Sequence, residues 1–332
     1  MSHLIDMTNG RANMAYVGET PWHTLGDVMR PGAPIEEWLV KSGLGFGVQR
    51  ATVHFKGTDE RVHKGISEVL YRDDSFAQLG IVSPSYKIVQ PREVLEFFRD
   101  VVGTGGLELE TAGSLDEGKK VWALAKTGNS FSIKGQDLVR GYLLLSTSFD
   151  GSQATRAEFT SVRVVCNNTL RIAQSKGSSS GLVKIPHSST FDARGTKIEL
   201  GLINGAWGQF EEQATALADR KLSNKEAMNL LFEIMEPKLA AQLSKGEKVE
   251  LSTMRKNQIT SVFELFQGRG MGSGLVAAQG TAWGMVNAVT QYVDHEITAR
   301  GDAINNRFRS AQFGPGAQLK TTAFETALAL VA

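Results

Sequence analysis

Residues 142–172 read YLLLSTSFDGSQATRAEFTSVRVVCNNTLRI. A first apolar run ends at the turn-forming sequence Phe149-Asp150-Gly151, and a second run with alternating apolar residues occupies 157–165. Two such runs joined by an Asp-Gly turn predict a β-hairpin. The polar sequence Cys-Asn-Asn-Thr follows at 166–169, and we expect the hairpin to lead into a helix there. This stretch therefore predicts part of a sheet with a helix beside it.

Further strands are expected earlier in the chain. Runs rich in β-forming residues occupy 49–56, 68–71, 78–82 and 120–126, and turn residues separate them. A helix should begin at Pro91, because proline suits the first turn, with Val94, Leu95 and Phe98 on its buried face. Hairpins interrupted by helices are typical of α+β proteins. We therefore predict an α+β core domain at 1–200, with a mixed or antiparallel sheet and packed helices.

The pattern changes to helices after residue 200. Apolar residues at helical spacing predict helices at 198–220, 223–235, 252–266 and 281–298. Ser223 and Glu226 have the separation of a capping box, which marks the start of the second of these helices. The sequence therefore predicts a carboxy-terminal helical domain at 201–332.

Composition limits the function classes. The chain has 332 residues, enough for about two domains. Its formal net charge of +1 creates no long-range attraction for nucleic acid, so a site for a polyanion must come from a local cluster of basic residues. The single cysteine, Cys166, excludes an internal disulfide and suits a reducing compartment. We see no signal-peptide pattern and no apolar run of about 20 residues, so we expect a cytoplasmic protein with no membrane contact.

Motifs for catalysis and metal binding are missing from the sequence. The glycine-rich run GRGMGSG at 268–274 lacks the Gly-Lys-Ser/Thr ending of a phosphate loop, and a flexible joint between helices explains it better. His23, His187 and His295 lack the spacing of a helical pair of metal ligands. We therefore predict no catalytic residue, no metal and no cofactor.

Basic residues and amides gather in and around the predicted central strands. Arginine suits bidentate contacts with phosphate, and asparagine both donates and accepts hydrogen bonds. Because charges that alternate with apolar residues in a strand share one face, we expect an exposed basic sheet face, with Trp122 as a stacking surface. A basic loop at 174–196 would lie beside it. The candidate DNA-binding residues are Lys119, Lys120, Trp122, Lys126, Arg140, Arg156, Arg163, Asn167, Asn168, Arg171, Lys176 and Lys184.

An ordered series of short phrases resembles a known family. The phrases are GETPWHTLG at 18–26, TAGS at 111–114, SFDGS at 148–152, VRVVCNNTL at 162–170, TAWG at 281–284, NAV at 287–289, YVDH at 292–295, FG at 313–314 and LK at 319–320. This series resembles the uncharacterised phage/plasmid-like protein family, a domain of unknown function found in phages, prophages and conjugative plasmids. The resemblance covers nearly the whole chain.

The resemblance implies a role in DNA metabolism. Members of that family tend to occur beside DNA replication and recombination functions, including single-strand binding proteins. The order of hairpins and helix also resembles, in architecture only, phage annealing proteins of the Red-beta and RecT kind. We therefore expect a protein of the host cytoplasm that binds single-stranded DNA and anneals it without catalysis. Exposed edge strands would join identical subunits into a ring or filament, and a single-strand binding protein would be a further partner.

Two other classes of function stay open at this point. An enzyme that processes a small molecule or a nucleotide would use a site near His23, Asn167 and His187. A phage accessory protein would instead bind a host protein.

Overall fold

The computed structural model describes residues 5–8, 10–18, 25–105, 107–163, 168–171, 182–196, 204–248, 250–297, 310–312 and 314–332. The chain is an α+β protein, as the sequence predicts. It forms two compact units. The sheet unit comprises Met1–Gly128, Tyr142–Phe159 and Leu182–Ile203, and the helical unit comprises Asn129–Gly141, Thr160–Gly181 and Asn204–Ala332. The helical unit thus includes two segments that precede the domain boundary expected near residue 200.

Eight strands of the described chain form a central sheet. Their order is β12-β11-β10-β9-β8-β3-β4, with β13 also paired to β11. The bounds are β3 (Met14–Val17), β4 (Asp27–Met29), β8 (Glu108–Leu115), β9 (Lys120–Ile133), β10 (Asp137–Ser148), β11 (Thr155–Arg163), β12 (Asn168–Arg171) and β13 (Leu182–Ile185). The sheet is mixed, because β3 and β4 are parallel whereas β8–β9, β11–β12 and β11–β13 are antiparallel. Strands β1 (Met7–Thr8) and β2 (Arg11–Ala12) form a separate short ribbon.

The predicted hairpin is present as β10 and β11. The hydroxyl groups of Thr147 and Thr155 lie 2.8 Å apart across its closed end. Ser148 Oγ donates to the carbonyl of Gln153 at 2.9 Å, and the Gln153 amide donates back to that hydroxyl at 3.1 Å. These buried side-chain bonds satisfy backbone groups in the turn and hold the two strands in register.

The prediction that this hairpin leads into a helix is wrong. Asn168–Arg171 forms β12, which runs antiparallel to β11 with Arg163 opposite Asn168. The backbone groups along a strand edge need partners, and a returning strand supplies them. For the same reason Leu182–Ile185, expected in the basic loop, forms β13 on the first half of β11. Residues 174–181 of that loop lie outside the described chain.

Helices α1 (Ile35–Lys41) and α2 (Pro91–Gly105) belong to the sheet unit. Helix α1 contacts α2, and α2 also contacts β8. Val94, Leu95 and Phe98 of α2 are fully buried, as their spacing predicts. The helix begins at its proline, so both its start and its buried face could be inferred from the sequence.

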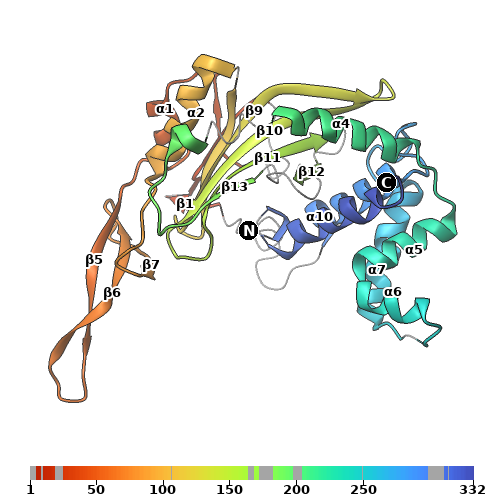
Figure 1. Cartoon of the computed structure of the whole chain (residues 1–332). Helices are drawn as coiled ribbons and strands as arrows, with labels where there is room; N and C mark the ends of the chain where they lie inside the picture. The colour runs from red at the N-terminus through yellow and green to blue at the C-terminus, as the bar shows by residue number, and fades with distance from the viewer. Residues whose placement is uncertain are drawn as a thin grey trace. The chain divides into compact units, whose positions relative to one another are not determined.

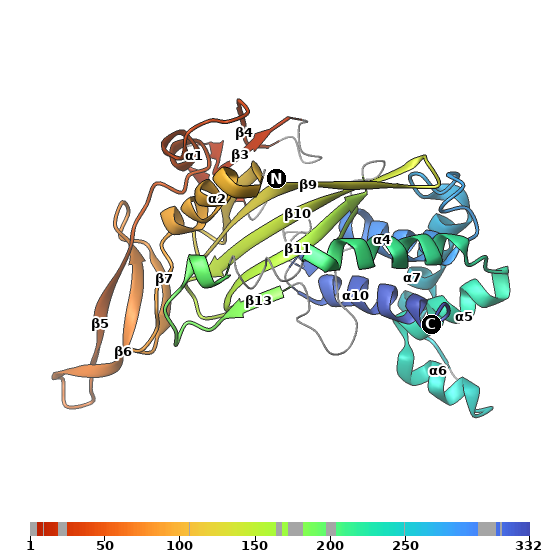
Figure 2. The same ribbon diagram turned by 45° about the horizontal axis from the view of Figure 1, so that its top comes forward.

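A second sheet projects from the sheet unit. Strands β5 (Val48–Lys56), β6 (Val62–Arg72) and β7 (Gln78–Val82) are antiparallel with β6 in the middle. Beyond β7, residues 53–56 of β5 and 62–67 of β6 continue as a two-stranded ribbon with the turn between them. This ribbon is here called the arm (Figures 1 and 2). Strands β5 and β7 match the predicted 49–56 and 78–82 closely, but β6 begins at Val62 and not at residue 68. Its first half is polar and contains glycine, so pairing with β5 makes it a strand where local propensity does not.

The three-stranded sheet, from which the arm extends, is held against the core of the sheet unit. Leu70 of β6 is fully buried. A Cβ at Gly80 of β7 would lie 2.6 Å from the carbonyl oxygen of Phe149, so glycine permits the close approach of β7 to the hairpin turn. The Arg72 guanidinium lies 3.9 Å from the centre of the Phe46 ring, which meets Phe149 edge-on at 6.5 Å. These contacts hold the sheet in place at the base of the arm.

The helical unit is built around aromatic side chains. Its helices are α4 (Asn204–Asp219), α5 (Asn224–Met235), α6 (Pro237–Ser244), α7 (Thr253–Glu264), α8 (Ala282–Gln291) and α10 (Pro315–Leu328). Helices α7 and α8 continue into π-helical segments at Leu265–Arg269 and Tyr292–Glu296. The Phe210 ring lies 5.7 Å from Phe131, 6.4 Å from Trp283 and 5.6 Å from Phe324. The Trp283 indole also donates a buried hydrogen bond of 3.0 Å to the Asp137 carboxylate.

The capping box predicted at Ser223 is confirmed, and it should make the stability of the protein depend on pH. Hydrogen bonds from the Ser223 backbone and from Arg220 lower the pKa of Glu226 from 4.5 to about 2. Because this folded-state pKa is depressed, the stabilisation is present above about pH 4.5 and is lost as the pH falls toward 2. We expect the melting temperature of Glu226→Gln to fall less than that of the wild type between about pH 6 and 3. Glu233→Gln, an exposed change in the same helix, is the control and should behave like the wild type.

Candidate nucleic-acid interface

Two of the candidate DNA-binding residues are buried. The Lys120 ammonium lies 3.2 Å from the Asp116 carboxylate and 3.7 Å from that of Asp150, and its side chain is 5% exposed. Trp122 is also 5% exposed. This corrects the expectation that β9 presents both side chains to solvent: both faces of the strand are buried over residues 120–123, and two carboxylates offset the buried charge. Neither side chain is placed to contact a strand of DNA.

The other described candidates are more accessible but do not form one row. Lys126 makes an ion pair of 2.9 Å with Glu110, and Lys119 and Arg140 are half-buried. Arg156 of β11 is half-buried and lies opposite the exposed Lys184 of β13 in the register. The structure therefore brings Arg156 and Lys184 together on neighbouring strands.

The backbone register places three of the remaining candidates. Arg163 is opposite Asn168 in the backbone register of β11 and β12, and Arg171 is opposite Thr160. The side chains of Arg163, Asn168 and Arg171, and the whole of Asn167, Lys176 and His23, lie outside the described residues.

His187, a candidate for the alternative enzyme site, is held in a structural contact. Its ring nitrogens lie 2.9 Å and 3.0 Å from the backbone carbonyl oxygens of Lys87 and Gln153. The ring also stacks on Tyr86 at 4.1 Å, and the Tyr86 hydroxyl donates to the Ser148 carbonyl at 2.6 Å. Burial raises the pKa of Tyr86, so this phenol stays protonated and keeps donating. Both edges and one face of the imidazole are therefore engaged in joining segments of the sheet unit.

The tip of the arm presents an exposed aromatic pair. Phe55 of β5 and His63 of β6 are directly opposite in the register, and their rings stack at 5.6 Å with an interplanar angle of 27°. The Phe55 side chain is 56% exposed although it belongs to a residue type that is normally buried. Flat exposed rings of this kind offer a surface on which a nucleobase can stack.

Charged residues of both signs lie near this aromatic pair. Lys56 pairs with Glu60, and the ring of His63 lies 2.9 Å from the Asp59 carboxylate. The His63 hydrogen bond lowers the pKa of Asp59, so that carboxylate stays ionised. Arg61 and Lys64 are exposed, and the described part of the chain shows no ion pair to either side chain. Two exposed cations of the tip thus form no ion pair within the described chain, and Lys64, which is opposite His54 in the register, leaves β6 from the other face than His63.

A search with models of known protein families finds one match. The model described as a domain of unknown function, DUF932, matches residues 78–312, which is more than half of the chain. The chain belongs to the DUF932 family. The expectation of an uncharacterised family is thereby confirmed, whereas the likeness to Red-beta and RecT stays a prediction. No curated protein and no solved structure matches this DUF932 chain. The matched region begins at β7, so the tip of the arm precedes it.

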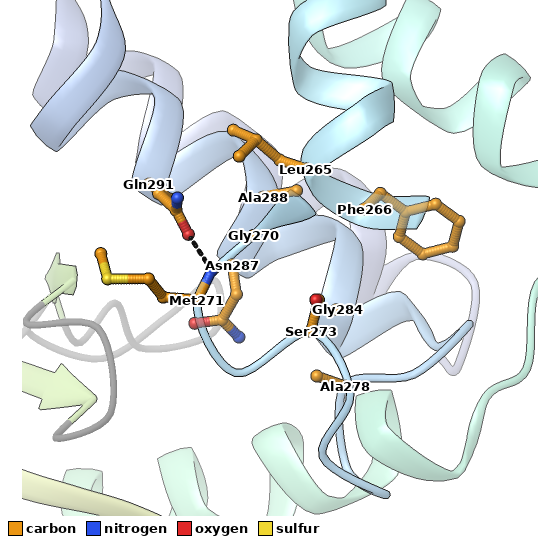
Figure 3. Close-up of a pocket in the computed structure, with 10 residues that line it drawn as sticks. All are labelled: Leu265, Phe266, Gly270, Met271, Ser273, Ala278, Gly284, Asn287, Ala288 and Gln291. Atoms are coloured by element: carbon orange, nitrogen blue, oxygen red, sulfur yellow. Dashed lines mark hydrogen bonds between the residues drawn. The ribbon is translucent and has the colours of Figure 1, made fainter. Parts of the chain in front are cut away.

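The glycine-rich segment of the DUF932 chain lines a small hollow in the helical unit (Figure 3). The hollow has room for about one water molecule. The Met271 amide donates to the Gln291 side chain at 2.8 Å, and a Cβ at Gly284 would lie 1.9 Å from the Ala278 carbonyl oxygen. Arg269, which could have met a phosphate, pairs instead with Glu296 at 2.8 Å. This region is a tight helix junction and not a site of ligand size.

Two further observations limit the chemistry of this DUF932 chain. Within the described residues, no three His, Cys, Asp or Glu side chains are grouped so that they could hold a metal ion. None of the described helices is long and apolar enough to span a lipid bilayer. The tip of the arm was missed as a site because the first half of β6 is polar and contains glycine; the aromatic residues at 55 and 63 were the available signal.

Proposed function

We propose that this DUF932 protein binds single-stranded DNA through the tip of its arm. The observation that carries the proposal is the exposed Phe55–His63 ring pair at a tip that also carries the exposed cations Arg61 and Lys64. Bases of a single strand stack on aromatic rings, and the phosphates that join them are attracted to nearby cations.

Annealing is the activity that we propose for this binding. A protein that holds one strand by its phosphates and by a few stacked bases leaves other base edges free to pair with a complementary strand. The support comes from the sequence resemblance to a family found beside replication and recombination functions. No catalytic group is required for this activity, since base pairing itself drives the reaction.

The test measures affinity for a fluorescent single strand of about 40 nucleotides, long enough for several sites, by anisotropy. The wild type should bind, and its affinity should fall between about 50 and 200 mM salt. Phe55→Ala should weaken binding by about 1–3 kcal/mol for each stacked base that is lost. Arg61→Ala with Lys64→Ala should lower the slope of log affinity against log salt by about 1.4, because each phosphate contact contributes about 0.7 on a single strand.

Matched variants locate the interface. Lys225→Ala removes an exposed cation from α5 and should leave the affinity unchanged. Binding that is insensitive to both arm variants but lost in Arg156→Ala with Lys184→Ala would move the interface to β11 and β13. Absence of binding at low salt would refute the proposal, and binding with no acceleration of pairing between labelled complementary strands would refute annealing.

A further inference from the structure

His187 lies between two backbone carbonyl groups of the sheet unit. Its Nδ1 atom is 2.9 Å from the carbonyl oxygen of Lys87, and its Nε2 atom is 3.0 Å from that of Gln153. A carbonyl oxygen only accepts hydrogen bonds, so both contacts are hydrogen bonds only if each ring nitrogen carries a proton. Neutral imidazole has one N–H group, whereas imidazolium has two. The geometry of these two contacts, here called the His187 joint, therefore fits the charged ring.

The stacked ring of Tyr86 also favours a cation at this place. It lies 4.1 Å from the His187 ring at an interplanar angle of 16°. Tyr86 is buried, and its hydroxyl donates to the Ser148 carbonyl, so the ring is fixed in position. The face of an aromatic ring attracts a cation. The half-buried imidazole thus has an aromatic face on one side and a carbonyl oxygen at each edge.

Other charged groups near the joint have their own partners or are exposed. Arg50, which donates to the Tyr86 carbonyl, is paired with Glu68 at 2.8 Å. Asp150, whose charge acts on Tyr86, lies 3.7 Å from the Lys120 ammonium. The side chains of Lys87 and Lys184 are exposed. Among the described residues no carboxylate forms an ion pair with the His187 ring, so the two carbonyl groups are the acceptors for its protons.

We propose that His187 is a proton-operated switch that fastens the segment after β13 to the turn of the β10–β11 hairpin. With both protons in place, the ring bonds to Lys87 and to Gln153 at the same time. Loss of one proton sets a nitrogen lone pair against a carbonyl oxygen, and that contact opens. Imidazole is the side chain that changes its charge between about pH 5 and 8, so the switch operates in this range.

The contact with Gln153 is the one that opens. The Lys87 amide donates to the His187 carbonyl at 2.6 Å, and this second bond keeps residue 187 beside Lys87. The Gln153 carbonyl also accepts from the Ser148 hydroxyl at 2.9 Å, so it keeps a partner when the ring leaves. Strand β13 ends two residues before His187 and pairs with the start of β11, which follows Gln153 closely. Opening therefore loosens β13 on β11, whether or not the protein binds DNA.

The protons of the ring test the proposal directly, by nitrogen-15 NMR of protein labelled at histidine. At about pH 5.5 both His187 nitrogens should carry protons that exchange slowly with water, unlike the Nε2 proton of the exposed His54. At about pH 8.5 Nε2 should have lost its proton while Nδ1 keeps it. Protons that exchange as fast as that of His54, or a ring that loses the Nδ1 proton first, would overturn the proposal.

Hydrogen exchange measures the effect on β13. Relative to an unstructured chain, the amides of Leu182–Ile185 should lose about tenfold in protection between about pH 5.5 and 8.5, because one charge-assisted hydrogen bond is lost. His187→Phe keeps a stacked ring without a donor and should show the lower protection at both pH values. His54→Gln, which removes an exposed histidine of the arm, is the control and should match the wild type.

Equal protection of β13 in the wild type and in His187→Phe at the acidic pH would show that the ring fastens nothing, and the proposal would fail. Circular dichroism verifies that each variant keeps the fold. If His187→Phe does not fold, the ring nitrogens of the wild type still decide the matter.

Discussion

Lys320→Ala should lower the free energy of unfolding by about 3–5 kcal/mol, which is typical when one member of a buried ion pair is removed. The Lys320 ammonium lies 2.7 Å from the Asp294 carboxylate, and the two side chains are only 3% and 8% exposed. Lys320 belongs to α10 and Asp294 to the π-helical segment after α8, so the pair joins two elements of the helical unit. Urea unfolding, followed by circular dichroism, measures the effect.

A double replacement separates the charge effect from packing. Lys320→Met with Asp294→Leu removes both charges and keeps similar volume, and we expect it to recover most of the lost stability. Lys225→Ala, at an exposed position of α5, should change the free energy of unfolding by less than about 0.5 kcal/mol. If Lys320→Ala were as mild as this control, the pair would carry no structural role.

Lys120→Ala should lower the free energy of unfolding by about 3 kcal/mol and leave the affinity of the folded protein for single-stranded DNA unchanged. The reason is that Lys120 is buried between the carboxylates of Asp116 and Asp150, which would repel each other once the ammonium is removed. If Lys120→Ala instead had normal stability and weakened DNA binding, Lys120 would belong to the DNA interface. Measuring both quantities on the same preparation distinguishes the two roles.

This site should also respond to acid. Burial raises the pKa of Asp150. Hydrogen bonds from Ser152 and the charge of Lys120 outweigh this effect and hold that pKa below its ordinary value of 3.8. Because the folded-state pKa is depressed, the stabilisation is present above about pH 4 and is lost as the pH falls below it. The melting temperature of Lys120→Ala should therefore fall less steeply than that of the wild type between about pH 5 and 3.

Elements with strong local signals could be predicted from the sequence. The proline at 91 and the spacing of Val94, Leu95 and Phe98 defined the start and the buried face of α2. Ser223 and Glu226 marked the start of α5, because a capping box acts between residues three apart. The Asp150-Gly151 turn located the β10–β11 hairpin for the same reason. In each case the atoms that decide the structure are close in sequence.

Elements that depend on distant partners were missed. The chain after β11 was expected to be helical, but β12 forms because β11 offers it a free edge. The first half of β6 lacks an apolar pattern and becomes a strand by pairing with β5. The candidate site was misjudged for the same reason. Lys120 and Trp122 alternate with apolar residues as in a surface strand, yet both faces of β9 are buried at this point.

The alternation of β5 shows most clearly where local information ends. By itself the sequence determined that residues 49–56 form a strand with two unlike faces, since Gln49, Ala51 and Phe55 alternate with Arg50 and other polar residues. It could not determine which face is buried, because a period of two is satisfied by either orientation. The tertiary structure decided this through contacts made by other strands: Leu70 of β6 is buried, and Gly80 of β7 lets the sheet approach the hairpin turn closely. The face of β5 that carries Ala51 and Phe55 was thereby left exposed.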